Sequence, residues 1–198
     1  MSEPEAEMQK KNRDGLDIAA EILTVAMEGV IKTHIMYRAG LSFAQLKKYL
    51  DLLTNPDITL EMIVGYNPIL KTEKRKKRGK HAITVEILKL AKKGVNKTKI
   101  MYEGKLSFFQ LKKYLGSLQK SGHLKKDKKT YKTTDKGLAY LDNIQGVENI
   151  LLASTSEPLL KGGEEGRKFK TTGPGLELIK IYGKLEGNSG SLTPYVHV

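Results

Sequence analysis

The sequence predicts a mainly α-helical fold with small β-hairpins, of the α+β class, built from two copies of one unit. The chain repeats itself without gaps, so "KTHIMYRAGLSFAQLKKYL" at 32–50 returns as "KTKIMYEGKLSFFQLKKYL" at 97–115. Apolar residues within each copy recur at helical spacing. After the second copy, two short β-type pieces are joined by a lysine-rich tip, a pattern typical of a hairpin.

The first two helices are clearest in the second copy. A set of apolar residues at spacings of four, seven and eight predicts one buried face: Ile83, Ile87, Leu90 and Ala91. This helix should end near Gly94. The next segment, "NKTKIMYEGK", predicts a short helix with Ile100 and Met101 facing inward, ended by Gly104.

A third helix is predicted to begin at Ser107, because Ser107 and Gln110 have the spacing of a capping box, as do Ser42 and Gln45. Its expected buried stripe, with Tyr114 on the border, is Phe108, Leu111, Leu115 and Leu118. The repeated tyrosines and the pair Met36/Met101 are also expected in the core.

A hairpin and a last helix follow the third helix. Ser121 and Gly122 predict a turn, and the β-type pieces lie around Leu124 and Tyr131. Thr134 is suited to cap the last helix. Three of its apolar residues are spaced for burial: Leu138, Leu141 and Ile144. Three helices, a hairpin and a final helix describe a winged helix-turn-helix unit.

The first copy completes this pattern less clearly. Its "ITLEMIVGYNPILKTEKRKKRGK" at 58–80 is expected to supply the hairpin, or wing. A third echo, "FKTTGPGLELI" at 169–179, is similar to "YKTTDKGLAYL" at 131–141, and we interpret it as a partial duplicate or a loose appendage. The predicted division is a disordered segment 1–14, a first winged helix 15–78 with a divergent wing, a strongly basic second winged helix 79–150, and an extension 151–198 with a partial wing-like repeat.

The pattern "ILKLAKKGVNKTKIMYEGKLSFFQLKKYLGSLQKSGHL…YKTTDKGLAYL" resembles the archaeal winged helix-turn-helix family of predicted transcriptional regulators, which is related to small nucleoid DNA-binding proteins. The resemblance covers about 17–144 as two tandem copies. It implies a winged-helix fold, binding of double-stranded DNA, and dimerisation through the last helix. Because one chain carries two copies, the alternatives are a homodimer and an internal pseudo-dimer.

Charge and composition point to the same class of partner. Between Lys71 and Lys136 there are 22 Lys or Arg and 5 Asp or Glu, an excess larger than the net charge of +13 of the whole chain. Such a localised basic segment favours a polyanion, most often nucleic acid. The chain has no cysteine and its four histidines lack metal-ligand spacing, so we expect no metal and no cofactor. Without a signal peptide or an apolar span, we expect a cytoplasmic protein, at the nucleoid, with no membrane partner.

The candidate DNA-binding residues belong to the third helix, the wing and the basic run between the copies. In the second copy they are Lys97, Lys99, Ser107, Phe109, Gln110, Lys112, Lys113, Lys125, Lys126, Lys128 and Lys129. In the first copy and the run they are Gln45, Lys47, Lys48, Arg75, Lys76, Lys77 and Arg78. Lysines suit phosphate, and glutamine suits adenine, unless Gln45 and Gln110 only close their capping boxes. Phe109 could contact thymine methyl groups or a dimer partner, or its exposure could be incidental.

No catalytic arrangement is recognisable, so we expect a protein that is not an enzyme. "GGEEG" and "GPG" lack the context of a phosphate-binding loop, and no serine has a recognisable histidine and carboxylate. The alternative to DNA binding is a winged-helix scaffold that assembles a larger complex. It is favoured by Asp51, Asp57 and Glu61, which make the first copy less basic.

Overall fold

The computed structural model describes residues 13–55, 63, 78–153, 157–162 and 168–187. These residues are mostly helical with small antiparallel sheets, which confirms the predicted fold class. The first part of the chain contains α1 (Gly15–Val25), β1 (Val30–Ile31), α2 (Lys32–Arg38) and α3 (Phe43–Leu53). The second contains α5 (Lys80–Ala91), β2 (Val95–Asn96), α6 (Lys97–Glu103), α7 (Phe108–Lys120), β3 (Leu124–Asp127), β4 (Thr130–Thr133) and α8 (Asp135–Ala153). The third contains β5 (Leu160–Gly162), β6 (Lys168–Thr171) and α9 (Gly173–Leu185).

The second unit follows the predicted order of elements. Strand β2 pairs with β4, and β4 pairs with β3, so the sheet order is β2-β4-β3. Helix α6 ends at its C-cap Gly104, and Gly122 has φ +77°, as the predicted break and turn require. The Thr134 hydroxyl accepts a hydrogen bond from Gly137 N at 3.2 Å, which confirms Thr134 as the cap of α8.

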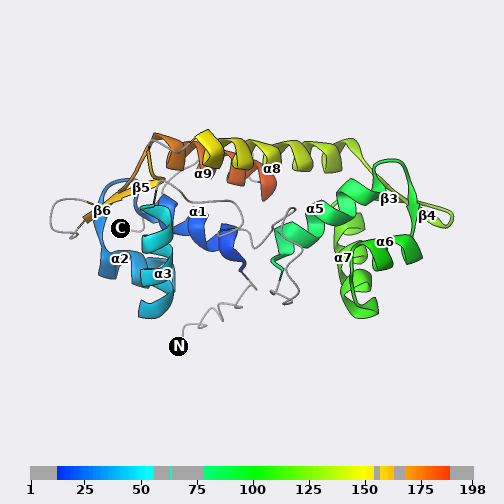
Figure 1. Cartoon of the computed structure of the whole chain (residues 1–198), viewed down its shortest axis with the longest axis horizontal. Helices are drawn as coiled ribbons and strands as arrows, with labels where there is room; N and C mark the ends of the chain where they lie inside the picture. The colour runs from blue at the N-terminus through cyan, green and yellow to red at the C-terminus, as the bar shows by residue number, and fades with distance from the viewer. Residues whose placement is uncertain (1–12, 56–62, 64–77, 154–156, 163–167, 188–198) are drawn as a thin grey trace, which may run out of the picture.

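The first unit obtains its hairpin from the far end of the chain. Strand β6 pairs with β1, with Val30 opposite Phe169, and β5 pairs with β6, so the sheet order is β1-β6-β5 (Figure 1). The interpretation of 169–179 as a loose appendage is therefore wrong. The hairpin expected at 58–80 lies almost entirely outside the described residues. Within it, Ile63 is helical and buried.

The two hairpins join their units through equivalent contacts. Thr133 Oγ1 donates to Leu88 O at 2.7 Å in the second unit, and Thr171 Oγ1 donates to Leu23 O at 2.5 Å in the first. A glycine then allows close approach of the following helix to the hairpin. A Cβ on Gly175 would lie 2.3 Å from the carbonyl oxygen of Leu159, and Gly137 has the equivalent position. The sequence "KTT", followed three residues later by a glycine, thus forms the same connection between hairpin and helix in both units.

Several predicted core positions are confirmed and others are wrong. Leu111, Leu115 and Leu118 are buried, but Phe108 is 53% exposed because it begins the helix beyond the packed face. Tyr49 is buried, whereas Tyr37 and Tyr102 are exposed. Met36 and Met101 are partly buried and pack against the core, and Leu141 and Ile144 are buried. Leu90 is half-buried, and Leu138 is 38% exposed.

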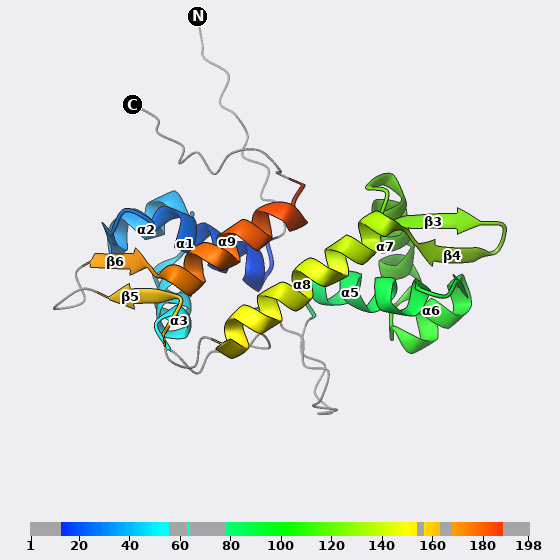
Figure 2. The same ribbon diagram turned by 90° about the horizontal axis from the view of Figure 1, so that it is seen from above.

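Helices α8 and α9 connect the two units. They pack against each other and run in opposite directions across one side of the molecule (Figure 2). A Cβ on Gly146 of α8 would lie 3.0 Å from Ile181 Cδ1 of α9, so the helices approach closely there. Helices α3 and α7 project from the opposite side (Figure 1). Each unit therefore contributes its last helix to one shared pair, which is the arrangement of a pseudo-dimer within one chain.

A buried polar network lies where the units meet. Asp17 Oδ1 of α1 accepts from Tyr182 Oη of α9 at 2.7 Å and lies 2.9 Å from Lys80 Nζ of α5. His81 Nε2 is 3.3 Å from the same carboxylate oxygen, and His81 Nδ1 is 2.5 Å from Tyr140 Oη of α8. In the first copy, the positions equivalent to Lys80 and His81 are Gly15 and Leu16, so this network breaks the symmetry of the repeat.

The carboxylate of Asp17 is held in its charged form by this network. Burial alone would raise its pKa, but hydrogen bonds from His81, Lys80, Tyr182 and the Asp14 backbone outweigh burial and lower the pKa well below its usual value. The Asp17 carboxylate therefore binds a proton more tightly in the unfolded chain than in the folded chain. The stabilisation is present above about pH 4, the ordinary range of an aspartate, and is lost as the pH falls below it.

We expect Asp17→Asn to lower the free energy of unfolding by about 3 kcal/mol at neutral pH, because Lys80 and His81 lose a buried anionic partner. Chemical denaturation of both proteins at neutral pH and near pH 3 measures this. The gap between the intact chain and the variant should shrink in acid. An equal gap at both pH values would contradict the assigned role of Asp17.

Candidate nucleic-acid interface

The start of α7 has the capping box expected from the sequence. Gln110 N donates to Ser107 Oγ at 3.2 Å, and Ser107 N donates to Gln110 Oε1 at 3.1 Å. Ser42 and Gln45 make the same reciprocal pair at the start of α3. Each glutamine therefore closes its own capping box. The side-chain oxygens are occupied, so base recognition through Gln45 and Gln110 would depend on their amide nitrogens.

Exposed lysines lie one turn further along α7. Lys112 and Lys113 are exposed, while Leu111 and Leu115 on the other face are buried. Lys97, at the start of α6, is half-buried with its Nζ 4.4 Å from the centre of the Phe108 ring. Lys99 pairs with Glu103 at 3.6 Å on the exposed face of α6. Lys112 and Lys113 therefore have the clearest access to a phosphate.

The second wing adds a row of cations beside α6. In the β3–β4 hairpin, Lys125 lies opposite Lys132, and Lys128 at the tip has φ 48°. Lys125, Lys126, Lys128 and Lys129 are all exposed. A shallow hollow of about 420 Å³ separates the wing from the start of α6, and it is lined by Asn96, Lys97, Thr98, Lys126, Lys128, Lys129 and Tyr131. The structure thus brings predicted lysines from α6 and from the wing to one concave surface.

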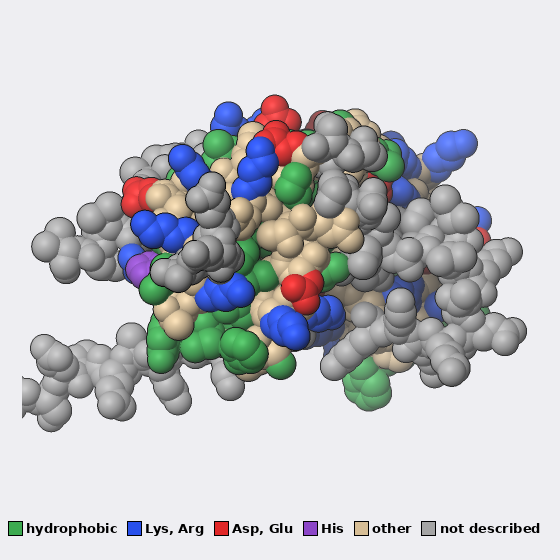
Figure 3. Space-filling model, turned by 60° about the vertical axis from the view of Figure 1, so that its left-hand side comes forward, with side chains coloured by type: hydrophobic (Ala, Val, Ile, Leu, Met, Phe, Trp, Pro, Cys, Tyr) green, Lys and Arg blue, Asp and Glu red, His purple; other side chains and the backbone are tan. Residues whose placement is uncertain are grey.

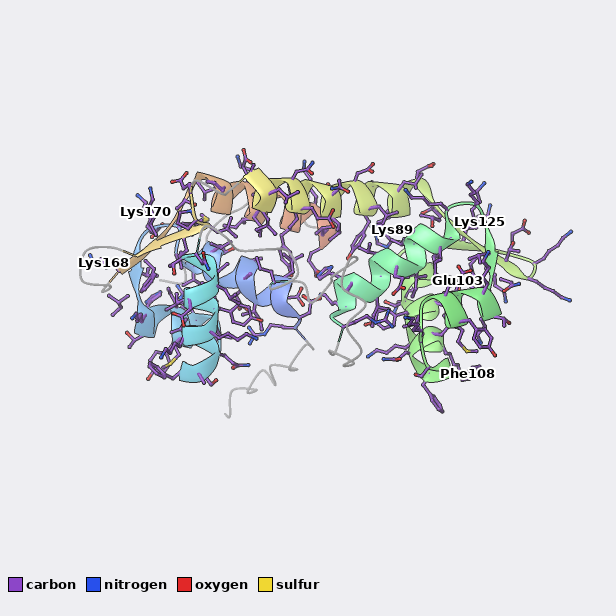
Figure 4. The ribbon with its side chains drawn as sticks, viewed as in Figure 1. Lys89, Glu103, Phe108, Lys125, Lys168 and Lys170 are labelled. Atoms are coloured by element: carbon purple, nitrogen blue, oxygen red, sulfur yellow. The ribbon has the colours of Figure 1, made fainter. Side chains whose placement is uncertain are left out.

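Aromatic side chains project next to these cations. Phe109 is 82% exposed, and Phe108 points away from the helix bundle at the free end of α7 (Figure 4). The two rings meet edge to face at 6.0 Å between centroids. Tyr102 on α6 is also exposed. Exposed aromatic groups of this kind suit contact with base edges and methyl groups or with a protein.

Arg78 has a structural role within the chain that the composition of the basic run does not indicate. It forms an ion pair with Glu86 and donates from Nη2 to the carbonyl oxygens of Gly104 and Lys105 at 2.7 and 3.1 Å. Arg13, its counterpart in the first copy, makes the same set of contacts in the first unit. Burial raises the pKa of Glu86 despite the opposing effect of Arg78. Arg75, Lys76 and Lys77 lie outside the described residues.

The first unit presents a similar surface with a different source for its wing. Lys47 and Lys48 are exposed on α3, with Asp51 one turn further along. The hairpin adds Lys161, Lys168 and Lys170, all exposed, at the end of the molecule opposite Lys125 (Figure 4). Lys and Arg side chains are spread over this end of the surface, among hydrophobic groups (Figure 3). Among these wing lysines, Lys170 belongs to the echo "FKTTGPGLELI" at 169–179, and Lys168 directly precedes it.

One group of possible metal ligands occurs among the described residues. Asp14, Asp17 and His81 have ligand atoms within 4.8 Å of one another. They were not grouped from the sequence because His81 is distant from both aspartates along the chain. The Lys80 ammonium lies against Asp17, and His81 N donates to Asp14 Oδ2 at 3.1 Å. The group therefore already has protein cations and donors, and we assign it to the junction between the units.

Comparison with known families and proteins adds two findings. A family model described as winged helix-turn-helix matches residues 12–66 and 77–152. No curated protein matches the chain. The two matched regions correspond to the two copies of the repeat. None of the helices within the described ranges is long and apolar enough to cross a membrane.

Proposed function

The chain belongs to the winged helix-turn-helix family, and from this premise we propose that it binds double-stranded DNA through the third helix and the wing of its second unit. The observation that carries this proposal is the set of exposed lysines on α7 and on the β3–β4 hairpin, which packs against α7. The hairpin lysines also share one hollow with Lys97 at the start of α6. In this family of folds the third helix enters the major groove, and the wing contacts the neighbouring backbone. The exposure of these lysines on α7 and on the wing supports phosphate contacts.

Within this role, each group of residues has a proposed task. Lys112 and Lys113 contact the phosphates that flank the major groove, together with Lys97 and Lys99. Lys125, Lys126, Lys128 and Lys129 contact the adjacent backbone. Ser107, Phe109 and Gln110 lie at the start of α7, the part of such a helix that reaches base edges. We leave Arg78 out of this set because its guanidinium is engaged within the chain.

We propose that the biological role is transcription regulation or nucleoid association, in the cytoplasm, without catalysis. Lysines suited to phosphate dominate the proposed interface, and phosphate contacts carry no sequence information by themselves. A nucleoid protein would bind promoter and random fragments with similar affinity. A regulator would prefer particular promoters by a factor of about 10³ or more.

The first test is a binding titration of the intact chain with a labelled duplex, followed by fluorescence anisotropy. If six to ten lysines contact phosphates, the affinity should fall by about 10³ to 10⁵ between about 50 and 200 mM salt. Absent binding, or binding that does not change with salt, would rule out the proposed function.

A second candidate function is docking of a protein partner on the first unit. Tyr37 and Phe43 are exposed there by 78% and 70%, and Asp51 lowers the positive charge of α3. Aromatic groups of this kind are enriched at protein interfaces. A chain that served only as a scaffold would show no salt-dependent affinity for duplex DNA in the same titration.

A further inference from the structure

The first unit carries a basic wing whose lysines occupy the same register as those of the second. Lys161 lies opposite Lys170 in the β5–β6 hairpin, just as Lys125 lies opposite Lys132 in β3–β4. Phe169 pairs with Val30 of β1, as Tyr131 pairs with Val95 of β2. The sequence predicts DNA-binding residues on the third helix of both copies, but a basic wing only in the second. The fold instead gives each unit a third helix with two exposed lysines and a wing with an opposed lysine pair.

Both of these surfaces belong to one side of the molecule. Helices α3 and α7 project away from the α8–α9 pair, and the two hairpins lie at the outer ends (Figures 1 and 4). The units are tied together by the α8–α9 packing and by the buried network around Asp17 and His81. Their relative position is therefore set within one chain, without a second copy.

The length of the connecting helix is of the same order as the repeat of a DNA duplex. Helix α8 has 19 residues and is about 28 Å long. Major grooves on one face of a duplex recur about every 34 Å, which is the spacing at which dimeric helix-turn-helix proteins bind two half-sites. Two units held at opposite ends of such a helix are thus suited to neighbouring major grooves.

The two surfaces are similar but not identical. Helix α7 begins with Phe108 and Phe109, whereas α3 begins with Phe43 and Ala44. One turn after its lysine pair, α7 has Gly116 where α3 has Asp51. A symmetric homodimer would present two equal surfaces to a palindromic site. This chain presents two unequal ones.

We propose that a single chain binds one duplex through both units at once, on two unlike half-sites about one helical turn apart. This inference rests on the proposed function and specifies its ligand: a non-palindromic duplex of roughly 20 base pairs, bound by a monomer. The first unit adds affinity because its encounter with the second groove is intramolecular once the second unit is bound.

The test compares short and long duplexes of random sequence, about 10 and about 22 base pairs, so that only the longer one spans neighbouring grooves. The proteins are the intact chain, Lys47→Glu/Lys48→Glu on α3, and Lys180→Glu/Lys184→Glu as a control with the same change in charge on α9. For each protein, fluorescence anisotropy gives the ratio of the dissociation constant for the short duplex to the dissociation constant for the long duplex. Sedimentation of the longer complex gives the number of chains bound.

The intact chain and the α9 control should show a ratio at least about tenfold larger than that of Lys47→Glu/Lys48→Glu, with one chain on the longer duplex. Equal ratios in all three proteins, or two chains on each longer duplex, would overturn two-unit binding and leave DNA binding by the second unit in place. Failure of the intact chain to bind either duplex would overturn the proposed function itself. Circular dichroism confirms that the variants, which change exposed side chains, remain folded.

Discussion

The Lys112→Glu/Lys113→Glu variant is expected to bind a duplex of about 22 base pairs at least about 100-fold more weakly than the intact chain. Both lysines are exposed on α7, one turn after its capped start, where the third helix of this fold meets the phosphates flanking the groove. A hydrogen bond to a charged group contributes about 1.5 kcal/mol or more, and every 1.4 kcal/mol is about a tenfold change in affinity. Two lost contacts therefore correspond to about a 100-fold loss of affinity, and the repulsion between two new carboxylates and the phosphates weakens binding further.

The matched control is Lys180→Glu/Lys184→Glu on α9. It changes the net charge by the same amount, and both side chains are exposed on α9, which lies on the side opposite to the one from which α3 and α7 project (Figure 1). Its affinity should stay within a few-fold of the intact chain, because exposed charges farther from DNA than about 10 Å are largely screened in salt. If both variants lost affinity equally, binding would depend on overall charge and not on α7.

Truncation after Ser156 is expected to unfold the first unit while the second keeps its structure. The deletion removes β5, β6 and α9, and with them six buried hydrophobic side chains: Leu159, Leu160, Phe169, Leu178, Ile179 and Leu185. Truncating one such side chain costs about 2–5 kcal/mol. Losing six corresponds to about 12–30 kcal/mol, which is comparable to or larger than the roughly 5–15 kcal/mol that stabilises a typical domain. Strand β1 would also lose its pairing partner.

Amide hydrogen exchange measures this effect for each unit separately. In the truncated chain, amides of α1 and α3 should exchange rapidly, whereas those of α5 and α7 should stay protected. A second truncation after Gly187 removes only 188–198 and keeps β5, β6 and α9, so it should leave both patterns unchanged. Persistent protection of α1 and α3 without residues 157–198 would show that the C-terminal hairpin is not needed by the first unit.

Local features of the units were predictable because they depend on neighbouring residues. The capping boxes at Ser42 and Ser107, the break at Gly104 and the cap at Thr134 all involve partners within a few positions. The buried stripe of α7 followed from helical periodicity, except at Phe108. Periodicity gives the direction of a side chain but not where the neighbouring helices end, so it could not show that Phe108 extends beyond the core.

Long-range pairing was not predictable in the same way. The echo at 169–179 is similar to 131–141, but its neighbouring residues do not indicate that β6 pairs with Val30 and Ile31, which lie far earlier in the chain. The network of Asp17, His81 and Tyr182 depends on that same pairing, since α9 must first reach α1. Arg78 was assigned to DNA by composition, and only its contacts with Glu86 and Gly104 show another use.

We propose that the surface made by α7 and the second wing binds the phosphates of duplex DNA. The slope of log Kd against log salt concentration tests this for the intact chain, Lys112→Glu/Lys113→Glu and Lys180→Glu/Lys184→Glu. Each phosphate contact contributes about 0.9 to this slope, so loss of two contacts should reduce it by about two in the α7 variant and leave it unchanged in the α9 control. An α7 variant whose slope equals that of the intact chain would contradict the claim.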